Sequence, residues 1–396
     1  MHLKRYFYKT DQRGFIEYFF VLIHTGIFQK ELTMKKLVLL FSCYLLSSMA
    51  LANLPYYPIT FPRDEAAHYD NIPYSYDRLI EWWYFNGKAT TDDGRNIGYD
   101  IAMFYPAKKV FGYVVTKPII HIQVADIDKQ QGYGVQTEYA VDDGNVSTSK
   151  LDITVDNDYS LKESQENGKT VYLLQATGSN KTTTIKLNLK YEPLTEPLLI
   201  NQTGLMPIPD NTNSYYYSIP RFKTTGTIQV NNTTYQINTT PGDSWMDHQW
   251  GDFNPEKFGW EWFSVRLTNG LIANIFLDVD YQHNEKVVGG LANIILPSGD
   301  LKFIPYTDFQ VSRDNYWLDP ALGIRYPLTF TFNFPQLNLQ LQNVAAFADQ
   351  ERNGYWEGAC NVSGTYNQDA VTGYSYTEIV YQSPATKKFA HQLLIE

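Results

Sequence analysis

Short runs that alternate apolar and polar residues dominate the chain from about residue 53 onward. β-branched and aromatic residues are frequent within the runs, and Asn-Gly, Asp-Gly and Ser-Gly steps separate them. Clear examples are residues 182–189, 226–230 and 328–334. A period of two, broken by turn-forming dipeptides, predicts antiparallel strands joined by hairpins. No amphipathic period longer than about three helical turns interrupts the pattern, so it predicts an all-β fold.

Two segments separated by roughly one domain length share the same order of features. Each has an aromatic strand, then a polar turn, then an apolar strand. The segments are 81–85, Asp93-Gly94 and 97–105, and then 260–263, Asn269-Gly270 and 271–279. This echo predicts two similar β-domains, which we place at residues 53–250 and 251–396. Their junction is expected near 240–255, where turn-forming residues bracket a short aromatic segment.

The first 52 residues differ from the rest of the chain. Residues 1–33 show neither a clean apolar run nor an amphipathic period, so Met34 is the expected true start. From there two lysines, an apolar run and Ala50-Leu51-Ala52 follow in the order of a secretory signal peptide. We therefore predict a signal peptide at residues 34–52 and an exported chain, periplasmic or secreted. The alternatives are a membrane anchor, for which the apolar run is shorter than about 20 residues, and a lipoprotein that uses Cys43.

Net charge and cysteine content limit the classes of partner and of chemistry that the chain can have. Without the seven Lys/Arg and three Asp/Glu of the leader, the totals of 32 and 42 leave a net charge of −14. No basic stripe tracks a phosphate backbone, so we expect neither nucleic acid nor an anionic membrane surface as a partner. No stable membrane insertion is expected after cleavage of the leader. Cys360 would be the one remaining cysteine, and its apolar run favours a buried structural thiol over a nucleophile.

Residues 242–251 concentrate two acids, one imidazole and two indoles. If this segment is a strand, Met246, His248 and Trp250 lie on one face, and the opposite face carries Trp245, Asp247 and Gln249. A carboxyl or imidazole in an apolar wall has a shifted pKa and can deliver a proton near neutral pH. The alternative is that these polar groups satisfy backbone partners at a domain junction while the indoles fill a core.

Other site types are not indicated. The chain has no G-x-S-x-G, H-E-x-x-H, C-x-x-C or Walker-type motif. Its seven histidines include no close pair at metal-ligand spacing. We therefore expect no metal site and no cofactor.

Four stretches resemble the family of lipocalin-like carotenoid 1,2-hydratases (CrtC) and AttH proteins. Glu81-Trp82-Trp83-Tyr84 with Gly87 is similar to its opening E-W-W-Y-x-x-G, and residues 247–251 are similar to its D-H-x-W-G element. Residues 216–221 resemble the segment that leads toward that element, and residues 355–358, with Glu378 beyond them, resemble its closing element. His121 with Asp126 resembles a further H-x-x-x-x-D match.

The resemblance implies a fold, an activity and functional residues. It implies two lipocalin-like antiparallel β-barrel or sandwich domains and addition of water to an isoprenoid double bond. In the hydratase branch the suggested functional residues are the H-x-W pair, matched by His248 and Trp250, and a later Tyr-x-Asp. At residues 276–278 this chain keeps the acid, Asp278, and has Phe276 in place of the tyrosine.

These observations lead to one hypothesis with two alternatives. The chain is expected to bind an apolar or amphipathic small molecule and to hydrate or isomerise it. Asp247 or Asp278 would supply the proton, and His248 would orient the acid or the water. The candidate ligand-binding residues are Trp82, Trp83, Tyr84, His121, Tyr217, Trp245, Trp250 and Trp262, although core packing also accounts for each tryptophan. The alternatives are a non-catalytic carrier of hydrophobic ligands and a secreted hydrolase.

Overall fold

The computed structural model describes residues 56–72, 78–208, 212–280, 283, 286–352 and 354–395. The predicted leader, residues 34–52, and the segment before it lie outside the described residues. Residues 58–396 form one compact unit. Within the described part of the chain, no helix is both long and apolar enough to span a bilayer.

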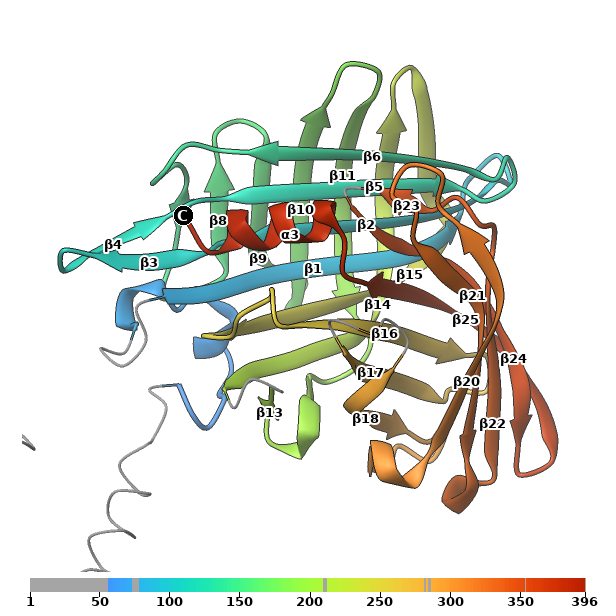
Figure 1. The fold of residues 1–396 in the computed structure, drawn as a ribbon. Helices are drawn as coiled ribbons and strands as arrows, with labels where there is room; N and C mark the ends of the chain where they lie inside the picture. Colours follow the sequence, from blue (N-terminus) through green and yellow to red (C-terminus); the bar gives the residue numbers. More distant parts are fainter. Residues whose placement is uncertain are drawn as a thin grey trace, which may run out of the picture. The chain divides into compact units, whose positions relative to one another are not determined.

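The first sheet is antiparallel and curled (Figure 1). Its main path has the order β6-β5-β2-β1-β15-β14-β11-β10-β9-β8-β7, so β1 and β15 pair at its centre although they are far apart in sequence. Short strands β12 and β13 pair with β14, and the hairpin β3–β4 extends from β1. The bounds are β1 Arg78–Thr90, β2 Asn96–Phe104, β3 Ala107–Val110, β4 Tyr113–Thr116, β5 Ile119–Asp126, β6 Gln131–Glu138, β7 Asn145–Val146, β8 Asp152–Val155, β9 Tyr159–Glu166, β10 Lys169–Ser179, β11 Thr184–Pro193, β12 Leu198–Leu199, β13 Leu205–Pro207, β14 Asn213–Val230 and β15 Thr233–Gly251.

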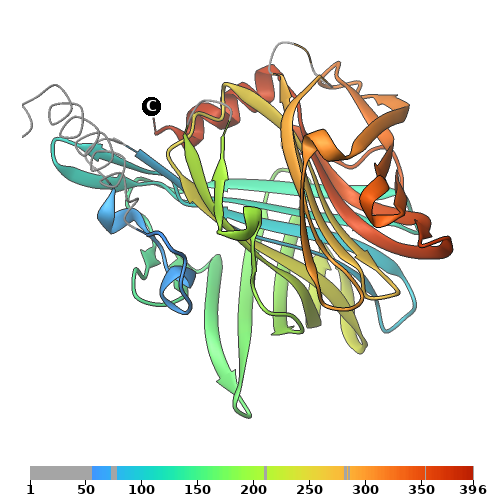
Figure 2. The same ribbon diagram turned by 90° about the horizontal axis from the view of Figure 1, so that it is seen from below.

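The second sheet follows after a short link. It has the order β19-β18-β17-β16-β25-β24-β22-β21-β20, with β23 on β24. Figure 2 shows it, in yellow to red, curling beside the first sheet. The bounds are β16 Phe258–Leu267, β17 Ile272–Asp280, β18 Val287–Ile295, β19 Leu301–Pro305, β20 Gln310–Leu318, β21 Arg325–Phe334, β22 Leu339–Ala345, β23 Glu351–Arg352, β24 Tyr355–Tyr366 and β25 Asp369–Val380.

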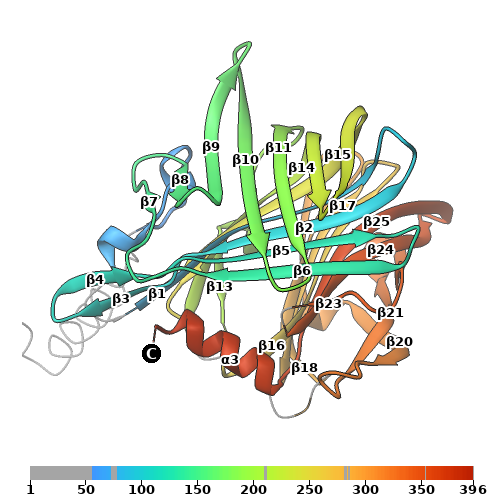
Figure 3. The same ribbon diagram turned by 90° about the horizontal axis from the view of Figure 1, so that it is seen from above.

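In the part of the chain that the structure describes, helical structure is confined to short segments. The 3-10 turns are η3 Arg63–Glu65, η4 Tyr69–Asn71, η5 Ile200–Gln202, η6 Tyr306–Asp308 and η7 Pro335–Leu337, and the α-helix is α3 Pro384–Leu393. Ser383 and Thr386 exchange side-chain and backbone hydrogen bonds at the start of α3, which is a capping box. Gln392 of α3 accepts a hydrogen bond from Gln136 of β6 at 3.1 Å. The helix therefore lies alongside the edge of the first sheet (Figure 3).

Successive side chains of each strand point to opposite faces of its sheet, so apolar side chains form separate layers inside each curled sheet and between the two sheets. Inside the first sheet, Phe85 stacks on Tyr191 with ring centroids 4.6 Å apart. Inside the second sheet, Phe263 packs edge-on against Phe330 at 4.7 Å. The alternate residues of the same strands, such as Tyr84 and Trp262, join a further cluster in which the two sheets contact each other. The layer between the sheets is where the candidate site lies.

The structure confirms the predicted all-β fold with two curled antiparallel sheets. Both halves of the sequence echo are neighbouring strand pairs, β1 with β2 and β16 with β17. Their turns contain Gly94 and Gly270 at φ of 86° and 91°, a conformation that favours glycine. The link between the sheets, residues 252–257, overlaps only the end of the expected region 240–255. The division into domains at residues 53–250 and 251–396 stays a prediction.

Candidate functional site

The segment 242–251 lies in β15, between β1 and β14. Its side chains alternate between the two faces of the sheet, as a strand requires. Asp247 and Gln249 line a cavity between the two sheets, whereas His248 stacks on Trp83 inside the first sheet, with ring centroids 4.5 Å apart. Asp247 and His248 therefore face opposite sides of one sheet. We expected His248 to orient the acid or the water beside Asp247 in one site. Because the two side chains face opposite sides of the sheet, this prediction is wrong.

The cavity has a volume of about 60 Å³, which is several times the ~10–15 Å³ that one water molecule needs. Strands β1, β2, β14 and β15 line one side of it, and β16, β17, β24, β25 and α3 line the other. No Lys, Arg or His belongs to its described lining. Ten of the lining residues are aromatic: Trp82, Tyr84, Phe104, Tyr216, Phe253, Trp260, Trp262, Phe276, Tyr355 and Phe389.

Asp247 projects from the first sheet and accepts three hydrogen bonds. The hydroxyls of Ser218 and Tyr216 donate to it at 2.5 and 2.7 Å, and the indole N–H of Trp245 donates at 2.6 Å. Burial raises the pKa of Asp247 to about 7, against the lowering effect of these three donors. Its carboxyl can therefore exist in both protonation states near neutral pH.

Tyr216 connects the two sheets at this carboxyl. While it donates to Asp247, its phenolic oxygen accepts from the indole N–H of Trp262 at 2.9 Å and from the amide of Asn274 at 3.0 Å. Because Tyr216 comes from β14 and both donors come from the second sheet, the contact fixes the sheets relative to Asp247. The orientation of this carboxyl is set by both halves of the fold.

Two further carboxyls, Glu357 and Glu378, line the cavity from the second sheet. They are cross-strand partners on β24 and β25. The hydroxyl of Tyr84 donates to Glu357, and the amide of Gln123 donates to its other oxygen at 3.1 Å. Glu378 has a hydrogen bond with the indole of Trp260. Burial holds the pKa of both glutamates well above the usual value, and the nearby Glu357 raises the pKa of Glu378 further. Burial therefore favours the protonated form of each carboxyl.

Asp100 of β2 lies behind Glu357 and is fully buried. It accepts a hydrogen bond from the hydroxyl of Tyr376 at 3.0 Å. Burial raises the pKa of Asp100 to about 8, and its interaction with Glu357 works against that rise. Like charges in one desolvated region oppose joint ionisation, so this pair retains a proton near neutral pH.

His121 lies at the periphery of the cavity. Its Nδ1 is 2.9 Å from the hydroxyl of Tyr355, a lining residue, and its ring packs on Phe389 of α3 at 4.7 Å. Burial lowers the pKa of His121 to about 3, so the imidazole is neutral. His121 is not part of the cavity lining, and it contacts the wall through Tyr355.

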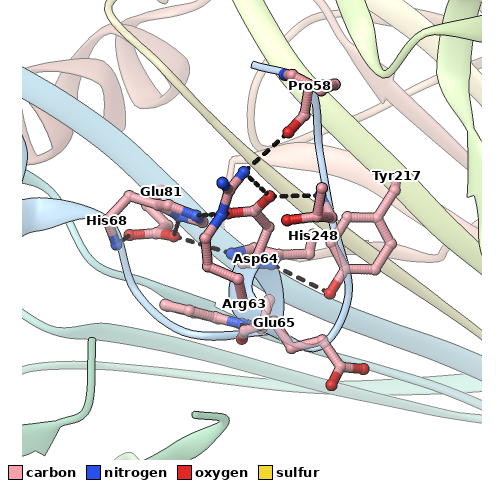
Figure 4. Close-up of polar contacts among 10 residues, drawn as sticks. Pro58, Arg63, Asp64, Glu65, His68, Glu81, Tyr217 and His248 are labelled. Carbon is pink, nitrogen blue, oxygen red and sulfur yellow. Dashed lines mark hydrogen bonds and ion pairs between the residues drawn. The ribbon is translucent and has the colours of Figure 1, made fainter. Parts of the chain in front are cut away.

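His248 belongs to a second buried cluster, on the other face of the first sheet (Figure 4). Glu81 Oε1 lies 2.9 Å from His248 Nε2 and 2.7 Å from His68 Nδ1. Asp64 Oδ1 is 3.3 Å from the other nitrogen of His68, and Arg63 pairs with Asp64. Burial alone would raise the pKa of Glu81, but the two imidazoles bring it down to about 2. The cluster ties the segment that precedes β1 to the centre of the sheet.

Three of these residues form the group of possible metal ligands found among the described residues: His68, Glu81 and His248. Both imidazoles contact the same carboxylate oxygen at hydrogen-bond distance. Each ring is also stacked on an indole, His68 on Trp250 at 3.9 Å and His248 on Trp83. A metal needs lone pairs directed at a common point with bonds of about 2.0–2.2 Å. The arrangement fits a hydrogen-bonded ion cluster better than a metal site.

The remaining predicted residues divide between the two faces. Trp82, Tyr84 and Trp262 line the cavity, and Trp245 contacts it through Asp247. Trp83, Trp250 and Tyr217 pack around the His248 cluster instead. Asp278 lies on the same face of β17 as the lining residue Phe276, beyond the described lining. Burial raises the pKa of Asp278 to about 7.

Glu357, Glu378, Trp260 and Tyr216 were not among the candidates from sequence. Three of them fall in stretches that match family motifs, but the motifs do not show which face each side chain occupies. A signal was present, since Glu357 stands between Trp356 and Gly358-Ala359 in the otherwise apolar run 355–360. An acid in such a run is either paired or functional.

Comparison with known proteins shows which family the sequence of this chain matches. A sequence profile described as AttH-like matches residues 52–380. Kievitone hydratase of Fusarium solani subsp. phaseoli is 22% identical over 180 residues, which are 43% of this chain and 50% of that protein. The matched region thus spans only about half the length of that curated relative.

Two solved structures share the fold. The AttH protein of Nitrosomonas europaea superposes with a TM-score of 0.66 at 22% identity, covering 83% of this chain and 98% of that one. Kievitone hydratase of Nectria haematococca superposes with a TM-score of 0.59 at 18% identity, covering 76% of this chain and 89% of that one.

Proposed function

We propose that this chain, which belongs to the AttH-like family, adds water to a carbon–carbon double bond of an apolar or amphipathic small molecule between its two sheets. The observation that carries the proposal is the arrangement of carboxyls in the cavity. Glu378 and Glu357 line it from the second sheet and Asp247 lines it from the first. The name of the relative, kievitone hydratase, supports the same reaction class.

The environments of the carboxyls assign different roles to them. Burial raises the pKa of Glu378 and so favours its protonated form, which can donate a proton to an alkene carbon. Asp247 has three donors that stabilise its ionised form, so it can accept a proton from water. Groups whose surroundings push their pKa values apart are the usual acid and base of such a site.

Glu378 and Asp247 together account for every proton that moves during the addition of water. The C–H bond forms with the Glu378 proton, which leaves a carbocation and a carboxylate. A water molecule then attacks the cation while Asp247 takes one of its protons. A proton returns from Asp247 to Glu378 to restore the starting state. The faces of Trp260 and Trp262 stabilise the cation, by about 2 kcal/mol for a desolvated contact.

The experiment uses two alkenes, kievitone and an acyclic carotenoid, with the full chain in ¹⁸O-labelled water. Mass spectrometry should show a product that has gained one labelled water. Glu378→Gln should abolish the gain, and Glu351→Gln, at a half-buried acid outside the cavity lining, should keep it. Failure of the wild-type protein to convert either alkene, or incorporation of unlabelled oxygen, would count against the proposal.

A carrier without catalysis is the second candidate, because α3 closes the cavity with Phe389 and Leu393 and the walls are largely apolar. Extraction of the purified protein and mass spectrometry of the extract would test it. An unreacted hydrophobic ligand that stays bound during long incubation favours the carrier. A hydrated form of that ligand favours the enzyme.

Export is also proposed, on the order of features in residues 34–52. Protein recovered from the source cell envelope should begin at Asn53. An N-terminus at Met1 would contradict this proposal.

A further inference from the structure

The charge of the cavity wall is one-sided. Its ionisable lining residues are the carboxyls Asp247, Glu357 and Glu378 and the phenols Tyr84, Tyr216 and Tyr355, with no basic side chain in the described lining. A wall that can only become negative repels anionic ligands such as fatty acids and phosphate esters. Positively charged ligands are not repelled by this wall, because its described lining holds no basic side chain.

Among the described residues, Arg266 is the buried cation near this wall. Arg266 lies between the rings of Trp245 and Tyr374, at 5.6 and 4.7 Å from their centroids. Its guanidinium donates to Asn86 at 3.2 Å and helps to lower the pKa of Asp247 from behind the wall. It therefore moderates one carboxyl and leaves the Glu357–Glu378 side without a cationic neighbour in the cavity lining.

Aromatic faces complete the arrangement. Trp82, Trp260 and Trp262 border the same space as the carboxyls. Indole faces attract ammonium groups through the ring quadrupole, and aromatic walls combined with acids are the usual means of binding quaternary ammonium compounds. The same forces would stabilise a carbocation formed during hydration. A stable organic cation would be bound in the same way but would not react with water.

We propose that the cavity between the sheets binds small organic monocations of the quaternary ammonium class, with the ammonium among Glu378, Glu357 and the indoles of Trp260 and Trp262. This inference deepens the proposed function and rests on it, because it uses the same cavity and carboxyls. It names a ligand class that stays bound without turnover. Such a ligand would compete with the alkene substrate.

Proton release should accompany binding. The groups that face the ammonium are Glu357, Glu378 and Asp247, with Asp100 behind them. A cation favours their ionised forms, so it displaces a proton from the wall. Affinity should therefore rise with pH, by at most about tenfold per pH unit for one displaced proton. A ligand held only by apolar contacts would not show this dependence.

Choline and its uncharged isostere 3,3-dimethylbutan-1-ol are suitable probes, because they differ in charge and hardly in shape. Isothermal titration of the full chain should give roughly tenfold tighter binding of choline near pH 8, the scale of a desolvated cation–π contact. The preference should shrink near pH 6. Titration in two buffers of different ionisation enthalpy should show the released proton.

Variants locate the site. Glu378→Gln should remove most of the preference for choline while binding of the alcohol stays unchanged, which also shows that the cavity is intact. The matched control Glu351→Gln, at a half-buried acid outside the cavity lining, should keep the preference. Equal affinity for the two probes, binding of neither probe, or a preference that survives Glu378→Gln would overturn the inference.

These outcomes are separable from those of the proposed function. Water addition without a preference for choline would leave the hydratase proposal standing and remove this one. A preference for choline without water addition to any alkene would leave a cavity that binds cations and remove the hydratase proposal.

Discussion

Glu357 of β24 and Glu378 of β25 are direct cross-strand partners, and their carboxyls share one wall of a cavity lined by aromatic rings. Like charges opposite each other in a sheet destabilise it. Here burial favours the protonated form of both groups, because it holds each pKa well above the usual value.

Replacement of Glu378 by Gln should separate catalysis from stability. The amide keeps the shape and removes the transferable proton, so conversion should fall by about 10²–10⁴-fold. The melting temperature should stay the same or rise, since a buried ionisable group is lost. Turnover and thermal unfolding measured on one preparation test this, with Glu351→Gln as the control. Retained turnover would exclude Glu378 as the proton donor.

Asp247 and His248 make an adjacent pair of variants with opposite expectations. Asp247→Asn keeps an oxygen that can accept from Ser218 and Trp245, so the variant should stay folded, and it should lose turnover. His248→Ala should lose about 3–5 kcal/mol of stability, because the buried charge of Glu81 loses a partner. Urea unfolding and specific activity of the folded fraction test both. A stable, inactive His248→Ala protein would reverse the two assignments.

The pH dependence of turnover should follow Asp247. Burial raises the pKa of Asp247 to about 7, so its base form is depleted at lower pH. The rate under kcat/KM conditions should therefore rise with pH up to the neutral region. Asp247→Asn should remove this rise from the residual activity. A wild-type profile that is flat between about pH 5 and 8 would contradict the role of Asp247 as the base.

Stability should fall as pH rises toward neutral, and Asp278 should contribute to this fall. Burial raises the pKa of Asp278 from 3.8 to about 7 in the fold. The folded state therefore holds a proton that the unfolded chain releases, and stability is lost as pH rises through this window. Asp278→Asn should match the wild-type protein near pH 4 and exceed it by up to about 4 kcal/mol near pH 8. Melting temperatures across this range test it.

Local patterns in the sequence were sufficient for the strands and for the faces of β15. An apolar–polar period of two fixes which side chains share a face, so Asp247 and Gln249 were separated correctly from His248 and Trp250. The echo of aromatic strand, glycine turn and apolar strand predicted two hairpins, because Gly94 and Gly270 adopt a backbone conformation that other residues avoid. These features depend on neighbours along the chain.

Tertiary structure alone decided which polar groups meet. Asp247, Glu357 and Glu378 come from strands of two different sheets, and His68, Glu81 and His248 meet although His248 is 167 residues from Glu81. The curl of each sheet and the contact of one sheet with the other bring such groups together. The same burial that creates the contacts shifts their pKa values, because removal from water penalises charge. No periodicity along the chain carries that information, so the sequence determined the faces and the packing of two sheets determined the site.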